Sequence, residues 1–154
     1  MENLQFYKNL IHSIYQNHSK RRIELPGFVP SAVLIPLFEK QNEPHLLFVK
    51  RSMTVRHHKG QISFPGGACD ASDRDLQDTA LRETEEEIGV SPDAVAMIAE
   101  LDDIVTPTHF RVTPFAGIIP FPYAFKIDPQ ETSELIEIPL THLLNEAHHR
   151  LGYR

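Results

Sequence analysis

The sequence has little of what marks secreted, membrane-spanning or nucleic-acid-binding proteins. Its one cysteine, Cys69, excludes an internal disulfide bond and fits a reducing compartment. No apolar run approaches the length that spans a membrane, and the N-terminus lacks the basic and then apolar pattern of a secretory signal. The C-terminus also lacks a peroxisomal SKL-type ending. We therefore expect a cytoplasmic protein without a membrane partner.

The sequence also has fewer basic residues than acidic ones. The 154 residues contain 15 Lys and Arg against 21 Asp and Glu, which gives a formal net charge of -6 at pH 7. A general nucleic-acid binder normally shows a basic face, so we expect no nucleic-acid partner. A small phosphate-bearing substrate stays compatible with this charge, because bound cations or a local basic loop can offset it. With no internal repeats or low-complexity linkers, residues 1–154 are expected to form a single domain.

Hydrophobic periodicity predicts a helix at each end of the chain and strands between them. A first amphipathic helix is expected within residues 1–20, with Leu4, Tyr7, Ile11 and Ile14 on one face. A closing helix is expected over residues 140–149, and strands over 31–38, 45–51, 94–101, 110–119, 121–127 and 135–139. Pro114 cannot donate to a backbone ladder, which predicts that strand 110–119 lies at a sheet edge.

The most informative stretch is a predicted helix that is rich in glutamate. Ser72 or Asp73 is a suitable N-cap and Gly89 a suitable C-terminal glycine, so the segment between them should form about four helical turns. One side of this helix can face a core; its members are Leu76, Ala80, Leu81, Thr84 and Ile88.

Glu83, Glu86 and Glu87 gather at the border of that side, whereas Glu85 points away. Their position is unfavourable, because the last helical turn carries the negative end of the helix dipole and because like charges three or four residues apart repel. A hard divalent cation between the carboxylates would remove both penalties, since it takes oxygen ligands. A solvated acidic face is the alternative, and we favour a metal site.

A segment dense in positive or protonatable groups leads directly into this helix. Residues 51–67 contain Arg51, Arg56 and Lys59, two histidines, and glycines that allow close backbone approach. Such a loop could hold the phosphate groups of a substrate beside the metal site. A solvated surface turn is the alternative; the combination of these features beside the acidic helix favours phosphate binding.

The acidic helix resembles a known signature. Gly67 followed by RETEEEIGV at residues 82–90 is similar to the box of the Nudix hydrolases, Gx5Ex7REUxEExGU, in which U is a bulky apolar residue. Thr84 stands at an aliphatic position of this box and Asp73 replaces its first glutamate. The spacing from Gly67 to Arg82 is one residue longer than in the general pattern.

The basic loop narrows this resemblance to one branch of the family. It is similar to the motif LLTxR(S/A)x3Rx3Gx3FPGG of the coenzyme A pyrophosphatases, whose loop before the helix is also longer and contains an aspartate. The matching positions are Arg51, Ser52, Arg56, Gly60 and the run Phe64-Pro65-Gly66-Gly67. Leu47-Phe48-Val49 stand in place of the first three letters.

Over about residues 31–139, the resemblance implies the Nudix fold, an α/β architecture in which a mixed β-sheet is sandwiched between α-helices. It implies hydrolysis of the diphosphate bond of coenzyme A or its derivatives to 3′,5′-ADP and 4′-phosphopantetheine, with Mg²⁺ or Mn²⁺ as cofactor. The implied metal ligands are Glu83, Glu86, Glu87 and the Gly67 carbonyl.

The remaining site residues would bind substrate or organise the carboxylates. Arg51, Arg56, Lys59 and Gly66 would contact the substrate, and the three basic side chains would hold its phosphates. Arg82 would orient carboxylates, since Glu86 is its i+4 neighbour and Glu85 its i+3 neighbour.

The general base stays open among four carboxylates, Glu83, Glu86, Glu87 and Glu131. In the family, a glutamate on the loop before the last strand can bind metal or activate water. Glu131 lies where that position is expected and is preferred to its neighbour Glu134, although a surface carboxylate is the alternative for both.

Two other functions compete with this hypothesis. The substrate could instead be another nucleoside diphosphate derivative, such as ADP-ribose or a dinucleotide. The chain could also be a catalytically silent binding module, against which the intact Glu83, Glu86 and Glu87 argue because silent relatives tend to lose them. Nudix domains often pair, so a homodimer is compatible with the resemblance.

Overall fold

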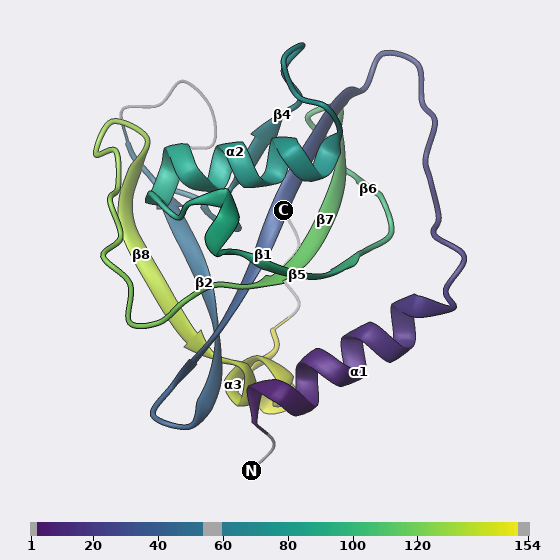
Figure 1. Ribbon diagram of the computed structural model, residues 1–154. Helices are drawn as coiled ribbons and strands as arrows, with labels where there is room; N and C mark the ends of the chain where they lie inside the picture. The colour runs from purple at the N-terminus through teal and green to yellow at the C-terminus, as the bar shows by residue number, and fades with distance from the viewer. Residues whose placement is uncertain (1–2, 54–59, 151–154) are drawn as a thin grey trace.

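The structure, a computed structural model, describes residues 3–53 and 60–150 (Figure 1). Helices lie at both ends of this part of the chain and one lies in the middle, with strands between them. The elements are α1 (Leu4–Gln16), β1 (Val29–Lys40), β2 (Glu43–Arg51), β3 (Ile62–Ser63), β4 (Gly66–Ala68), α2 (Leu76–Ile88), β5 (Ala96–Glu100), β6 (Ile104–Val105), β7 (Phe110–Ile118), β8 (Thr132–Pro139) and α3 (Leu140–Leu144). Short 3-10 turns occupy Pro92–Ala94 and Glu146–His148.

The strands form one mixed sheet. The path through its centre is β3-β2-β1-β7-β5, while β8 pairs with β2, β4 with β1 and β6 with β7. The β1 and β7 strands run parallel, and every other pairing among the described strands is antiparallel. The β1–β2 connection needs only two residues, Gln41 and Asn42, which adopt left-handed backbone angles that suit a tight hairpin.

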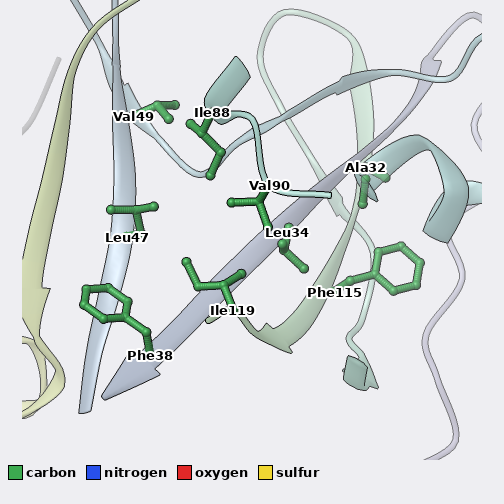
Figure 2. Packing of buried hydrophobic residues seen from close by; sticks show 10 residues of the cluster. Ala32, Leu34, Phe38, Leu47, Val49, Ile88, Val90, Phe115 and Ile119 are labelled. Carbon is green, nitrogen blue, oxygen red and sulfur yellow. The ribbon is translucent and has the colours of Figure 1, made fainter. Parts of the chain in front are cut away.

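Helices cover both faces of this sheet, so the predicted α/β architecture is confirmed. On one face, Ala80 and Ile88 of α2, together with Val90 just after the helix, pack against the side chains of β1, β2 and β7. Figure 2 shows Ile88 and Val90 reaching between Leu34 and Leu47 in this core. On the other face, residues of α1 and α3 pack on a second cluster, which includes Leu4, Ile11, Leu37, Leu46, Leu140 and Leu143.

The first helix is shorter than residues 1–20, because Asn3 caps its start and it ends at Gln16. The side chain of Asn3 accepts a hydrogen bond from the backbone N–H of Phe6 at 3.0 Å. The predicted apolar face is only partly buried: Tyr7 is buried, whereas Ile14 is 54% exposed. In the described part of the chain, no helix is long and apolar enough to cross a bilayer.

Two predictions about strands are wrong. The β7 strand lies between β1 and β5, although it contains Pro114. Its outer neighbour changes there, from β5 at Phe115 to β6 at Val112, and the Pro114 carbonyl accepts from the backbone N–H of Leu101 at 2.9 Å. No donor is needed from Pro114 at this gap, so its missing N–H is tolerated.

The second correction concerns residues 121–127, which form no strand. They belong to a connection, residues 119–131, that joins β7 to β8 without helix or strand. The alternating aromatic residues Phe121, Tyr123 and Phe125 pack against the core, which produces a period of two without any strand pairing. Prolines at 120 and 122 remove two backbone donors that a central strand would need.

Candidate active site

The acidic helix begins later than predicted. Asp75 is the N-cap of α2, and its carboxylate accepts from the backbone N–H of Asp78 at 2.8 Å. The predicted caps are used elsewhere, since Asp73 turns toward Arg82 and Ser72 donates to Asp70. Gly89 ends the helix as predicted, with φ 74° and its N–H bonded to the Glu85 carbonyl at 2.9 Å.

The glycine pair before the helix allows β4 to approach both β1 and α2. A Cβ atom added at Gly66 would lie 2.3 Å from the Ala32 carbonyl oxygen, and the φ of Gly66 is 154°. A Cβ atom added at Gly67 would lie 2.5 Å from the Cδ atom of Glu83. Only residues without a side chain fit at both positions, which brings the Glu83 carboxylate against the backbone of β4.

Arg82 joins three carboxylates and one backbone carbonyl. Its Nε and Nη2 atoms donate to the two carboxylate oxygens of Asp73 at 2.8 and 3.0 Å. Its Nη1 atom lies 2.8 Å from Glu83 and 3.3 Å from Glu86, and Nη2 also donates to the Ala68 carbonyl at 3.2 Å. The guanidinium thus orients Glu83 and Glu86. Glu85, the other partner expected for Arg82, is exposed and accepts no hydrogen bond from Arg82 among the described residues.

Asp73 is the member of this network whose role the sequence did not predict. Its side chain is only 2% exposed, and Thr79 also donates to it, at 2.8 Å. The hydrogen bonds from Arg82 hold the pKa of Asp73 well below its ordinary value, and those bonds raise the pKa of Arg82. The signal was present in the motif, because Asp73 occupies the position of the first glutamate of the Nudix box.

Glu87 sits in a different environment from Glu86, its neighbour in the chain. It is 3% exposed, whereas the Glu86 side chain is 56% exposed. Its carboxylate accepts from the Gly66 N–H at 3.2 Å and lies 3.7 Å from the Arg51 guanidinium. Burial raises the pKa of Glu87 to about 7, and the charges of Glu83 and Glu131 act in the same direction.

Glu131 is exposed and precedes Thr132, the residue of β8 that pairs with Arg51. Its negative charge contributes to the raised pKa of both Glu83 and Glu87, although burial is the larger cause for each. The Glu131 carbonyl accepts from the Ser52 N–H at 2.7 Å, which fixes it beside the end of β2. Glu134 is exposed as well, and it pairs with Lys50 at 3.4 Å.

The basic loop is pinned where it leaves and re-enters the fold. The Arg51 N–H donates to the Gln61 carbonyl at 2.9 Å, and the Gly60 N–H donates to the Arg51 carbonyl at 3.1 Å. Arg51 therefore faces Glu87 from a fixed position at the base of the loop. The predicted substrate residues Arg56 and Lys59 lie outside the described residues.

Carboxylate oxygens are suitable ligands for a divalent cation, although some of these oxygens already accept hydrogen bonds from Arg82. As they lie, no three His, Cys, Asp or Glu side chains of residues 3–53 and 60–150 are arranged to hold one ion together. Arg82 donates hydrogen bonds to Glu83 and Glu86, and the Gly66 N–H donates one to Glu87. Burial is the main cause of the raised pKa values of Glu83 and Glu87, neighbouring carboxylates add to it, and an oxygen-binding cation would stabilise both groups as anions.

Comparisons with known proteins match most of the chain. The family model described as NUDIX domain matches residues 28–151. A protein of Cronobacter sakazakii named "Uncharacterized Nudix hydrolase NudL" is 42% identical over 114 residues, which are 74% of this chain and 59% of that protein. A protein of the same name from Escherichia coli O1:K1 is 41% identical over 115 residues, 75% of this chain and 59% of that protein. The chain thus spans 59% of the length of these curated relatives.

Solved structures share the fold at low sequence identity. A Caenorhabditis elegans Ap4A hydrolase, solved as a binary complex, aligns with a TM-score of 0.63 at 16% identity, covering 74% of this chain and 83% of that chain. The NUDIX domain of Shewanella oneidensis NrtR, complexed with ADP ribose, aligns with a TM-score of 0.57 at 18% identity. That alignment covers 84% of this chain and 82% of the other.

Proposed function

Because the chain belongs to the Nudix family, we propose that it hydrolyses the diphosphate bond of coenzyme A or one of its derivatives in the presence of Mg²⁺ or Mn²⁺. The products would be 3′,5′-ADP and 4′-phosphopantetheine. The observation that carries this proposal is that Glu83 and Glu87 both lie against the backbone of β4, with the Arg51 guanidinium 3.7 Å from Glu87. Acidic groups for a cation and a basic group for a phosphate thus lie side by side.

Glu83, Glu86 and Glu87 would hold the metal, with the Gly67 carbonyl as a further ligand. A bound divalent cation supplies charge neutralisation on the diphosphate and lowers the pKa of an attacking water. Arg82 holds Glu83 and Glu86 in place before the ion binds, at 2.8 and 3.3 Å. Gly67 contributes by keeping its backbone in contact with the Glu83 carboxylate.

The proton of the attacking water would pass to one of the same carboxylates. Glu83, Glu86, Glu87 and Glu131 remain the candidates for this general base. Glu131 is supported by its charge, which contributes to the raised pKa of Glu83 and Glu87, and by its position next to β2, where its carbonyl accepts from the Ser52 N–H. Replacement of Glu131 by Gln, with Glu134→Gln as the matched exposed control, tests whether the neighbouring carboxylate is needed.

Arg51 would bind the diphosphate, because its charge faces the carboxylate cluster and its side chain is 30% exposed. The choice of coenzyme A over other nucleotides rests on the loop motif, which ends in Phe64-Pro65-Gly66-Gly67. ADP-ribose and dinucleotides are therefore the substrates against which the preference is measured.

The experiment is incubation of the protein with Mn²⁺ and coenzyme A, ADP-ribose or Ap4A at matched concentrations, followed by mass analysis of the products. We expect 3′,5′-ADP and 4′-phosphopantetheine from coenzyme A at the highest kcat/KM of the set. A higher kcat/KM for another nucleotide would contradict the substrate, and tight binding without metal-dependent turnover would identify a binding module. A folded Glu86→Gln, Glu87→Gln double variant with undiminished turnover would refute the site.

A further inference from the structure

The connection of residues 119–131 contacts the acidic helix and also ends at the carboxylate cluster. It has neither helix nor strand, so its position depends on its packing and on the hydrogen bonds at its contacts. Its aromatic half lies against the end of α2, and its last residue is Glu131. One segment therefore runs from the end of the helix that carries Glu87 to Glu131, whose carbonyl accepts from the N–H of Ser52, the chain neighbour of Arg51.

Tyr123 makes the central contact between this connection and the helix. Its hydroxyl donates to the Gly89 carbonyl at 3.2 Å and accepts from the Ser91 N–H at 3.3 Å. Three residues further on, the Lys126 N–H donates to the Ile88 carbonyl at 2.9 Å. Carbonyls at the end of a helix have no partner within the helix, so these donors complete its last turn.

The same end of the helix carries negative charge, which destabilises the last helical turn. Glu85, Glu86 and Glu87 lie in the last turn, where the helix dipole is also negative. Hydrogen-bond donors at the Ile88 and Gly89 carbonyls reduce that unfavourable interaction. The ring of Tyr123 is half-buried and lies 5.4 Å from that of Phe125, so packing holds the hydroxyl at the helix end.

We infer that Tyr123 is a positioning residue that sets the separation of Glu87 from Glu131 by joining the last turn of α2 to the connection that ends at Glu131. The inference rests on the metal site of the proposed function. Tyr123 contacts the helix end through Gly89 and Ser91, two and four residues beyond Glu87 in the chain, and would act on the cation only through the carboxylates.

The test is a Mn²⁺ titration by calorimetry on Tyr123→Phe, which removes the hydroxyl and keeps the ring. We expect the Kd for Mn²⁺ to rise about fivefold, because the two hydrogen bonds of the hydroxyl to the helix end are lost. Phe125→Leu is the matched control, because it removes packing from the same segment and leaves the hydroxyl in place. Its Kd should stay unchanged; an equal rise in both variants at a similar loss of stability would overturn the inference.

A double-mutant cycle separates positioning from a general loss of structure. In a Glu131→Gln background, the change from Tyr123 to Phe should alter the Kd for Mn²⁺ less than about twofold, since the separation it controls no longer matters. A full effect in that background would overturn the inference. A wild-type protein that binds Mn²⁺ and cleaves no nucleotide would overturn the proposed function alone, whereas failure to bind Mn²⁺ would overturn both.

Discussion

The two halves of the carboxylate cluster differ in how completely they are paired. Around Arg82, the carboxylates of Asp73, Glu83 and Glu86 all accept hydrogen bonds from the guanidinium. Around Arg51, the buried Glu87 lies 3.7 Å from the guanidinium. The Nε atom of Arg51 is also buried and has no hydrogen-bond partner in residues 3–53 and 60–150.

This difference is clearest between Asp73, whose pairing is structural, and Glu87, which a bound ligand could still pair. Hydrogen bonds hold the pKa of Asp73 far below its ordinary value, whereas burial raises that of Glu87 to about 7. A fully paired carboxylate stabilises the fold, and an underpaired one keeps charge that a cation or phosphate can satisfy. Each half should therefore respond differently when one of its members is replaced.

The largest effect is expected on catalysis when Glu87, the carboxylate beside Arg51, is replaced. Glu87→Gln should lower kcat for metal-dependent hydrolysis by about 100- to 1,000-fold, because several kcal/mol of charge stabilisation through the metal would be lost. Glu85→Gln is the control, since Glu85 is exposed. Steady-state kinetics with saturating Mn²⁺ measure both, and equal activity in the two variants would contradict this assignment of the halves.

The next effect concerns stability in the fully paired half. Asp73→Ala should lower the free energy of unfolding by about 3 kcal/mol, because Arg82 would keep its charge and lose two short hydrogen bonds. Asp78→Ala is the control, since Asp78 pairs with the exposed Arg74 and loss of that pair should lower the stability much less. Urea unfolding distinguishes them; similar losses in both would show that burial adds nothing to the Asp73 pair.

The same Glu87→Gln variant should be more stable than the wild type in the absence of metal. The folded pKa of Glu87 is raised from 4.5 to about 7, so the folded protein binds this proton more tightly than the unfolded chain. The associated stability is complete below pH 4.5 and is lost as the pH rises through 7.

That pKa shift corresponds to about 3 kcal/mol at most, and we expect a gain of about 1 to 2 kcal/mol above pH 7 because Arg51 and Gly66 lose a charged partner. Unfolding in EDTA between pH 4 and 8 tests whether the variant is the more stable protein, because this range spans the unfolded and folded pKa values of Glu87. A variant that is less stable than the wild type at pH 8, the upper end of that range, would show that Glu87 is stabilised as an anion.

The smallest effect is expected for Arg51→Lys. The charge beside Glu87 remains, but the planar donor geometry is lost, so kcat/KM should fall about fivefold to tenfold. Lys50→Arg is the control, because Lys50 pairs with Glu134 on the surface. Unaltered kinetics in Arg51→Lys would show that only the charge at this position is needed.

The local motifs predicted the active-site helix more accurately than they predicted the edges of the fold. Gly66, Gly67, Glu83 and Glu87 belong to one continuous segment, so their spacing already limits how they can lie relative to one another. The pairing of Asp73 with Arg82 depends on how residues 70–75 fold back, which helix periodicity does not describe. For that reason the N-cap was misassigned, while the helix end at Gly89 was correct.

Strand predictions were wrong where packing and neighbours, rather than local pattern, decide the outcome. The alternating aromatics at residues 121–125 have the period of a strand, but they pack on a core without pairing. Pro114 suggested an edge, yet a break between β5 and β6 provides a place for it inside the sheet. Which residues of the cluster bind ligand stays a prediction, because that depends on chemistry that the fold alone does not test.

Backbone hydrogen bonds hold the described residues on either side of positions 54–59. The Gly60 N–H donates to the Arg51 carbonyl, the Arg51 N–H donates to the Gln61 carbonyl, and the Ser52 N–H donates to the Glu131 carbonyl. Because these bonds lie outside positions 54–59, replacing those positions with a homologue's residues should leave the sheet and its melting temperature as they are, so that any change in the relative kcat/KM for coenzyme A and ADP-ribose would report on those positions alone.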